Sequence, residues 1–288
     1  MKPIVVGIDG SPGALQAVRW AATEARIRNR PLLLVHCWLL LDALRDPAAN
    51  DPAVFAAWQE RADGLVRVAV DAAEAVVPEV DVHTSIRSEL PTWGLLAAGE
   101  DAELMVVGAR GLGTFKQLLM GSTSREIAAR ATCPVVVVRG AERAHGRIVV
   151  GVDGSELSLA AVQFAFTEAS WRRATLVTVH ACGIPHEIHD LSKPLGAHVH
   201  AIEVDDEVRV QETLAGARED HPDVKVEETF VHDEAVPALV EHARLADLLV
   251  VGSRGHSATA GLLLGSVAHA VLRHADSPVA VVHPRARG

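Results

Sequence analysis

The chain has 288 residues, of which 49% are hydrophobic and 22% are charged, and its formal net charge is −10. This apolar content excludes an intrinsically disordered chain, and the negative charge argues against a duplex nucleic-acid partner, which needs a surplus of Lys and Arg on one face. The three cysteines form no Cys-x-x-Cys pair, which favours a reducing cytoplasm over a disulfide framework. Because neither a signal peptide nor an 18-residue apolar span is recognisable, we expect a cytoplasmic protein without a membrane or nucleic-acid partner.

The first half alternates short apolar runs with helical stretches. Residues 4–8 predict a strand, Ser11 and Pro12 suit the cap and first position of a helix, and residues 14–28 have helical spacing. Further strands are predicted at 32–37, 80–86, 104–108 and 134–138, and further helices at 56–76, 91–100 and 122–131. Strands separated by helices imply βαβ units, and therefore a Rossmann-like, doubly wound α/β domain with helices on both faces of a parallel sheet.

The second half repeats the first at an offset of 144 residues. VVGIDGS at 5–11 recurs as VVGVDGS at 149–155, and LMVVGARG at 104–111 recurs as LLVVGSRG at 248–255. Matches at one offset along the whole chain indicate a duplicated domain rather than a solenoid. We therefore expect two tandem domains of the same fold, residues 1–140 and 147–288, joined by a short polar linker.

The last predicted strand of each half is strongly apolar, at residues 134–138 and 278–282. At a sheet edge such a strand exposes unpaired backbone amides on an apolar ribbon. We expect the two strands to cover each other, so that the halves pack as an intramolecular pseudo-dimer. Two chains can associate further into a homodimer.

A glycine pattern follows the fourth predicted strand, where open α/β sheets bind ligands if the strand order reverses there. Gly108 and Gly111 are followed after nine residues by Gly121 and Ser122. Glycines let the backbone approach a ligand closely, and the Gly-Ser pair opens a helix whose positive end attracts anions. The same spacing recurs in the second half at Gly252, Gly255, Gly265 and Ser266.

Together with V-G-x-D-x-S after the first strand, this pattern resembles the universal stress protein family, as a tandem two-domain member, over nearly the whole chain. The resemblance implies five-stranded sheets of strand order 3-2-1-4-5 and an ATP site in each domain, with Mg as a companion ion and AMP or ADP as alternative ligands. It implies that Asp9 and Asp153 contact the ribose or the neighbouring phosphate, and that the backbone at Cys37 and Ala181 meets adenine. The residues implied for the phosphates are Gly108, Gly111, Gly121, Ser122 and Thr123 in the first half and Gly252, Gly255, Gly265, Ser266 and Val267 in the second.

Several of these residues have an alternative, structural interpretation. Asp9 and Asp153 can instead cap the following helix. Arg110 and Arg254 either touch phosphate or are solvated loop charges. The glycines can simply allow turns in the loops. His36 lies within an apolar strand, as does its repeat partner at position 180, and both are interpreted as core histidines. The sequence contains no Walker A motif, and GARGLG does not have the dinucleotide-binding spacing.

Two features differ between the halves. The first phosphate loop carries Gly113 and Lys116 where the second has Ser257 and Ala260. If either half binds phosphate less well, we expect it to be the second, which lacks that lysine. The connection after the second strand of the second half is rich in histidine. Its residues, which are interpreted as a polar loop with metal binding as the alternative, are His186, Glu187, His189, Asp190, His198 and His200.

These observations predict an ATP-binding stress-response sensor or regulator with one adenine-nucleotide site in each domain. The alternatives are a slow ATPase and a dimerisation scaffold that binds nothing. Fast phosphoryl transfer needs a positioned base and metal-held phosphates, and the recurring acid of the two halves is Asp9 or Asp153. A dedicated enzyme is therefore not expected.

Overall fold

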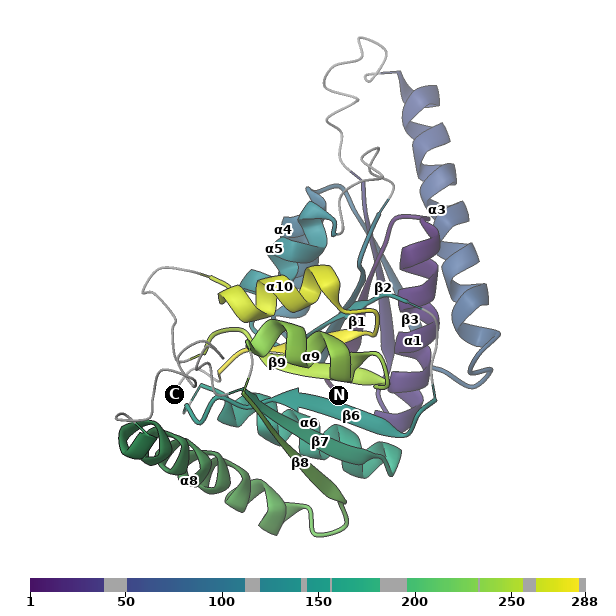
Figure 1. Ribbon diagram of the computed structural model, residues 1–288. Helices are drawn as coiled ribbons and strands as arrows, with labels where there is room; N and C mark the ends of the chain where they lie inside the picture. The colour runs from purple at the N-terminus through teal and green to yellow at the C-terminus, as the bar shows by residue number, and fades with distance from the viewer. Residues whose placement is uncertain are drawn as a thin grey trace. The chain divides into compact units, whose positions relative to one another are not determined.

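The computed structural model describes residues 1–38, 51–111, 120–140, 144–155, 157–181, 196–232, 234–255 and 263–284, with side chains of 196–206 left out. It divides into two compact units, Met1–Arg139 and Gly140–Gly288. Figure 1 colours the first unit from purple to teal and the second from teal to yellow.

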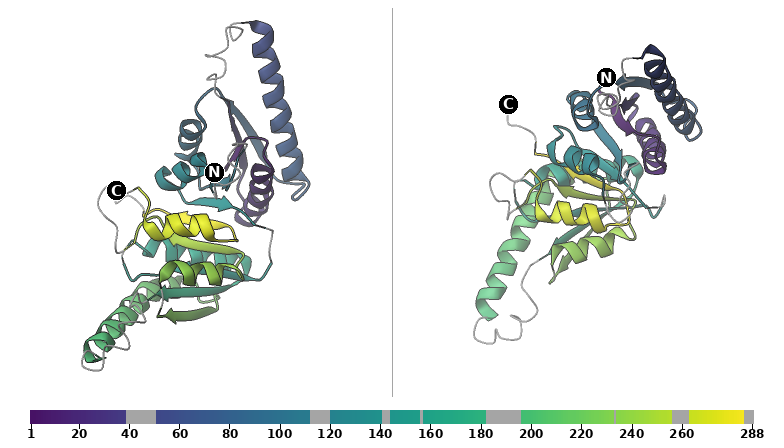
Figure 2. Two further views of the ribbon diagram at one scale, coloured as in Figure 1. Left: turned by 45° about the horizontal axis from the view of Figure 1, so that its top comes forward. Right: turned by 90° about the horizontal axis from the view of Figure 1, so that it is seen from above.

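The first unit is a five-stranded parallel sheet in the order β3-β2-β1-β4-β5. Helices α1 and α3 pack together over one face, and α4 and α5 pack together over the other (Figure 2). The elements are β1 (Ile4–Ile8), α1 (Pro12–Arg28), β2 (Leu32–Cys37), α3 (Pro52–Glu74), β3 (Val82–Arg87), α4 (Pro91–Gly99), β4 (Leu104–Gly108), α5 (Ser122–Arg130) and β5 (Val135–Val138).

The second unit has the same fold, with five parallel strands in the order β10-β9-β6-β7-β8. Counted from its own first strand, this is again the order 3-2-1-4-5, so the predicted Rossmann-like fold is confirmed. The pairing of the last strands of the two units stays a prediction. The elements are β6 (Arg147–Gly151), α6 (Leu159–Arg172), β7 (Thr175–Ala181), α8 (Gly196–Asp220), β8 (Val226–Val231), α9 (Ala235–Ala243), β9 (Leu248–Gly252), α10 (Ser266–His274) and β10 (Val279–Val282).

Helix α1 shows how local sequence determines an element. The Ser11 hydroxyl accepts a hydrogen bond from the Ala14 amide at 3.1 Å, Pro12 occupies the first turn, and Asn29 ends the helix in the left-handed conformation. Capping of this kind satisfies amides and carbonyls that have no partner inside the helix. The buried face consists mostly of alanine, which lets the helix lie close to the sheet.

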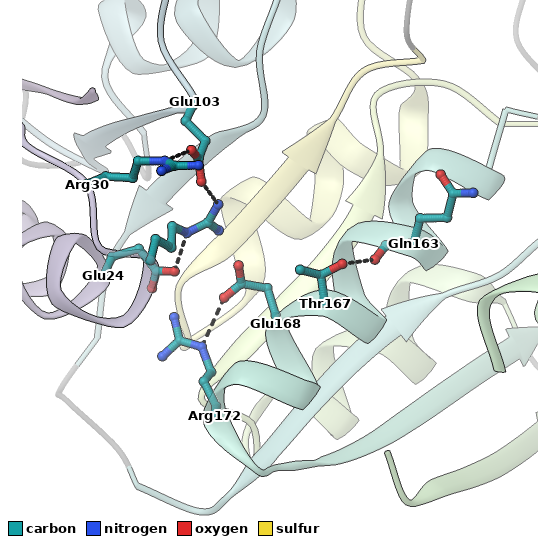
Figure 3. Close-up of polar contacts among 8 residues, drawn as sticks. Glu24, Arg30, Glu103, Gln163, Thr167, Glu168 and Arg172 are labelled. Carbon is teal, nitrogen blue, oxygen red and sulfur yellow. Dashed lines mark hydrogen bonds and ion pairs between the residues drawn. The ribbon is translucent and has the colours of Figure 1, made fainter. Parts of the chain in front are cut away.

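Both α1 and α6 carry an ion pair one helical turn apart (Figure 3). In the first unit, Arg28 contacts Glu24 at 2.6 Å and also Glu103 at 3.3 Å, and Arg30 contacts the same Glu103. In the second unit, Arg172 contacts Glu168 at 3.0 Å. The carboxylate of Glu103 therefore ties the end of α1 to the turn before β4.

Candidate functional site

At the carboxyl end of each sheet, the first strand separates from one neighbouring strand before it separates from the other. Strand β1 pairs with β2 over residues 4–8 but with β4 only over residues 4–6. In the second unit, β6 pairs with β7 over residues 147–151 but with β9 only over residues 148–150. This is the point of strand-order reversal at which open α/β sheets bind ligands.

A buried histidine stabilises the free end of the first strand in each unit. The Nδ1–H of His36 donates to the Ile8 carbonyl at 2.9 Å, and His180 donates to the Val152 carbonyl at 2.8 Å. These bonds satisfy carbonyls that lie beyond the pairing with β4 or β9. Both side chains are core residues, as expected from the sequence, although the Nε2 atom of His180 has no partner among the described atoms.

The crevice of the first unit contains a cavity of about 540 Å³. All eight first-half residues selected from the sequence line it, namely Asp9, Cys37, Gly108, Arg110, Gly111, Gly121, Ser122 and Thr123. Sequence reasoning did not identify its apolar wall, which includes Val35, Pro91, Leu95, Val107 and Met120. These wall residues come from several elements. Only Val35 could have been predicted from the sequence, because it lies two positions before Cys37 and therefore on the same face of β2.

Asp9 connects the two loops that form the cavity. Its Oδ1 accepts the Ser11 amide at 2.9 Å, which fixes the turn after β1. Its Oδ2 lies so close to Gly111 that a Cβ at this position would collide with the carboxylate. The helix cap is Ser11 rather than Asp9, and a side chain at position 111 would require the Asp9 carboxylate to move.

Gly108 has a packing function that the sequence did not reveal. A Cβ at Gly108 would lie 2.6 Å from the carbonyl carbon of Gly13, and a Cβ at Gly13 would lie 2.7 Å from the carbonyl oxygen of Arg110. The first turn of α1 therefore rests directly on the backbone that follows β4. The Ser124 hydroxyl adds a hydrogen bond of 2.7 Å to the Gly108 carbonyl, which connects α5 to the same place.

The amino ends of α5 and α10 have no side-chain cap. The Gly121 amide donates to the Ala109 carbonyl at 2.8 Å, and the Gly265 amide donates to the Ser253 carbonyl at 2.8 Å. No described side chain caps the amides of either helix at its first turn. In the first unit, Gly121, Ser122 and Thr123 at this helix start line the cavity, and uncapped amides at the amino end of a helix suit an anion.

Cys37 forms part of the opposite wall. Burial raises the pKa of its thiol to about 11, Arg87 lowers it, and Glu89 raises it further. The side chain is therefore a neutral thiol at pH 7 and is not a nucleophile. Its equivalent in the second unit is Ala181, at the end of β7, so no thiol chemistry is shared between the two sites.

The second unit brings its own selected residues to the same edge of the sheet. Asp153 follows β6, Gly252 is the last residue of β9, Arg254 and Gly255 follow it, and Gly265 precedes α10. A Cβ at Gly255 would collide with the Asp153 carboxylate, as at the equivalent position of the first unit. Ser266 and Val267 begin α10.

Two sequence differences fall outside the described residues. They are the pairs Gly113/Lys116 and Ser257/Ala260. The same holds for residues 186–190 of the histidine-rich segment, and the side chains of His198 and His200 in α8 are likewise not described. Within the described ranges no group of three His, Cys, Asp or Glu residues is placed to hold a metal ion.

Known proteins with a similar sequence or fold share this architecture. The model of the universal stress protein family matches residues 1–139 and 145–283. A universal stress protein of Mycobacterium tuberculosis is 36% identical over 96% of both chains, and one of Mycolicibacterium smegmatis is 36% identical over 98% of this chain and 97% of its own. The crystal structure of a universal stress protein from Archaeoglobus fulgidus has the same fold, with a TM-score of 0.73, 18% identity, and coverage of 99% of this chain and 98% of that one.

The described part of the chain contains no helix that is both long and apolar enough to cross a membrane. The family model covers both halves of the chain, and the relatives span its length. The chain therefore belongs to the universal stress protein family.

Proposed function

We propose that the crevice of each unit binds an adenine nucleotide, with ATP as the preferred ligand, and that the protein acts as a nucleotide-dependent regulator in a stress response. The observation that carries this proposal is the cavity of the first unit. It combines an acidic side chain, an uncapped helix end and an apolar wall in one space of about 540 Å³, which is within the range of small-molecule sites.

Each part of the nucleotide has a matching group in this cavity. The Asp9 carboxylate accepts hydrogen bonds and so suits the ribose hydroxyls. The α5 amides and the Ser122 hydroxyl donate hydrogen bonds and so suit the phosphates. Val35 and Leu95 provide an apolar surface for the base beside Cys37.

The cavity has one carboxylate among its described lining residues, Asp9. Mg²⁺ prefers oxygen ligands and keeps several waters, so the ion would be held chiefly by the phosphates and water. Among the described lining residues, no second acid is placed to orient an attacking water, which fast phosphoryl transfer requires. A regulator that hydrolyses ATP slowly or not at all fits this set of residues better than a dedicated ATPase.

The proposal is tested by nucleotide binding to the full chain, measured by titration calorimetry with ATP, ADP and AMP, and by mass spectrometry of nucleotide released on denaturation. Asp9→Ala should weaken binding at the first site at least tenfold, because a carboxylate partner of the ribose is lost. The matched control is Asp63→Ala on the exposed face of α3, which should bind as the wild type does. Wild-type protein that binds none of the three nucleotides would contradict the proposal.

The role as a regulator is tested separately by turnover. We expect release of phosphate from ATP far below the ~1 s⁻¹ of ordinary phosphoryl-transfer enzymes. Turnover at or above that rate, lost in Asp9→Ala, would instead identify an ATPase.

A further inference from the structure

The two units differ at the start of the helix that follows their first strand. Helix α1 begins at Pro12, directly after Ser11. Helix α6 begins at Leu159, which is the repeat equivalent of Leu15 rather than of Pro12. Leu157 and Ser158 lie in a turn instead, and the Ser158 amide and hydroxyl both donate to the Ser155 carbonyl, at 3.0 and 2.8 Å.

The repeat differs here at three consecutive positions, which are Pro12, Gly13 and Ala14 in the first unit and Glu156, Leu157 and Ser158 in the second. Of the three positions in the first unit, Gly13 is the one at which a side chain would meet the loop after β4. Any Cβ at Gly13 would be 2.7 Å from the Arg110 carbonyl oxygen, and a backbone atom cannot move aside as a flexible side chain can. By the same steric reasoning, a leucine side chain does not fit this close packing, and the second unit has Leu157 at the equivalent position. In the second unit a Cβ at Gly252 would be 3.6 Å from the Leu157 carbonyl, so the close contact between helix start and loop is absent there.

The same difference changes how the serine shared by both copies of the V-G-x-D-x-S pattern is used, Ser11 in the first unit and Ser155 in the second. Ser11 is buried, with 3% of its surface exposed, and its hydroxyl accepts the Ala14 amide and donates to the Arg110 carbonyl at 3.3 Å. It thereby joins α1 to the loop after β4. Ser155 is half-buried, and its hydroxyl donates to Asp153 Oδ1 at 2.6 Å instead.

The aspartate is consequently held differently in the two units. Asp9 is half-buried and its Oδ1 accepts the Ser11 amide. Asp153 is exposed, and its Oδ1 accepts both the amide, at 3.1 Å, and the hydroxyl of Ser155. A ribose hydroxyl that approaches this oxygen of Asp153 has to compete with the serine hydroxyl and with water, both of which weaken the net hydrogen bond.

We propose that the two nucleotide sites are unequal, with the tighter site in the first unit, and that Gly13 and Leu157 determine the difference. This inference rests on the proposed function, since it concerns the affinity of the same sites. It is independent of Lys116 and Ala260, because it depends on backbone packing and on the position of Asp9 and Asp153.

The test is titration of the full chain with Mg-ATP, with the sites assigned by Asp9→Ala and Asp153→Ala. The wild type should show two classes of site separated by about tenfold or more, with the tight class lost in Asp9→Ala. Gly13→Leu should weaken the tight site by at least about tenfold, because overpacking displaces the loop. Leu157→Gly should strengthen the weak site by about threefold or more.

Matched controls separate this effect from a general loss of folding. Gly64→Leu is the control for Gly13→Leu, because a Cβ at Gly64 in α3 meets nothing within 4 Å and the repeat equivalent is Val208. Leu245→Gly is the control for Leu157→Gly, because it changes an exposed leucine. Neither should alter the affinities. If Gly13→Leu unfolds the first unit, Leu157→Gly still tests the inference in the second.

Two sites of equal affinity in the wild type would overturn the inference and leave the proposed function intact. A folded Gly13→Leu variant with an unchanged affinity at the tight site would do the same. So would a folded Leu157→Gly variant with an unchanged affinity at the weak site. Absence of any nucleotide binding by the wild type would instead overturn the proposed function.

Discussion

Replacing Gly108 by alanine tests the packing of α1 against the loop after β4. The new methyl group would lie 2.6 and 2.7 Å from the carbonyl carbon and oxygen of Gly13 and 3.0 Å from the Ala14 amide nitrogen. All three are backbone atoms, so the first turn of α1 has to shift. Overpacking of this kind typically lowers the free energy of unfolding by about 1–3 kcal/mol.

The repeat provides two comparisons for the same substitution. At Gly252 the new Cβ would approach only the Arg254 carbonyl closely, at 3.0 Å, so we expect Gly252→Ala to cost less than about 1 kcal/mol. Gly64 lies within α3 and has open space around it. Gly64→Ala should therefore stabilise the first unit by about 0.4–1 kcal/mol, because alanine restricts the unfolded chain.

The assay is urea denaturation followed by far-UV circular dichroism, with a tryptophan fluorescence signal to detect separate transitions of the two units. At an unchanged slope, the shift of the midpoint reports the change in stability. Gly108→Ala with the stability of the wild type, or Gly252→Ala with as large a loss as Gly108→Ala, would refute the packing argument.

Three further predictions concern the first unit. Glu24→Leu removes a carboxylate with no exposed surface, so the guanidinium of Arg28, whose side chain is 4% exposed, loses one of its negatively charged partners. The free energy of unfolding should therefore fall by about 3 kcal/mol. A loss below about 1 kcal/mol would contradict this. Ser124→Ala removes the buried bond to the Gly108 carbonyl and should cost about 1–2 kcal/mol in the same urea assay, and an unchanged midpoint would argue against it. Burial raises the pKa of Cys37 from 9.0 to about 11, so its contribution to stability is present below pH 9 and is lost as the pH rises towards 11. The melting temperature of the wild type should therefore fall more steeply between pH 8 and 11 than that of Cys37→Ala. Equal slopes of melting temperature against pH would exclude this contribution.

Much of the fold followed from local patterns in the sequence. Short apolar runs, helix caps and one constant repeat offset predicted the parallel sheets. The duplicated glycine spacing, with the family resemblance that it supports, identified eight of the residues that line the first cavity. The start of α6 could not be predicted in this way. We attribute it to Leu157, because its counterpart Gly13 packs against the Arg110 carbonyl, a contact between residues far apart in the sequence.

The role of Gly108 was missed for a similar reason. The sequence suggested that its missing side chain makes room for a ligand, whereas the structure shows that it also makes room for the backbone of Gly13. The apolar wall of the cavity was missed because Val35, Leu95 and Met120 come from separate parts of the fold. Ordinary core residues on a strand or helix give no signal that they line a cavity.

The central claim is that the crevice of the first unit binds an adenine nucleotide through Asp9 and the amino end of α5. The most direct measurement is the amount and mass of nucleotide released from freshly purified, denatured protein, for the wild type and for Asp9→Ala, followed by titration of both with Mg-ATP. We predict about one tightly bound adenine nucleotide per wild-type chain, and its loss in Asp9→Ala. No adenine nucleotide in the wild type and no binding of added Mg-ATP would contradict the account.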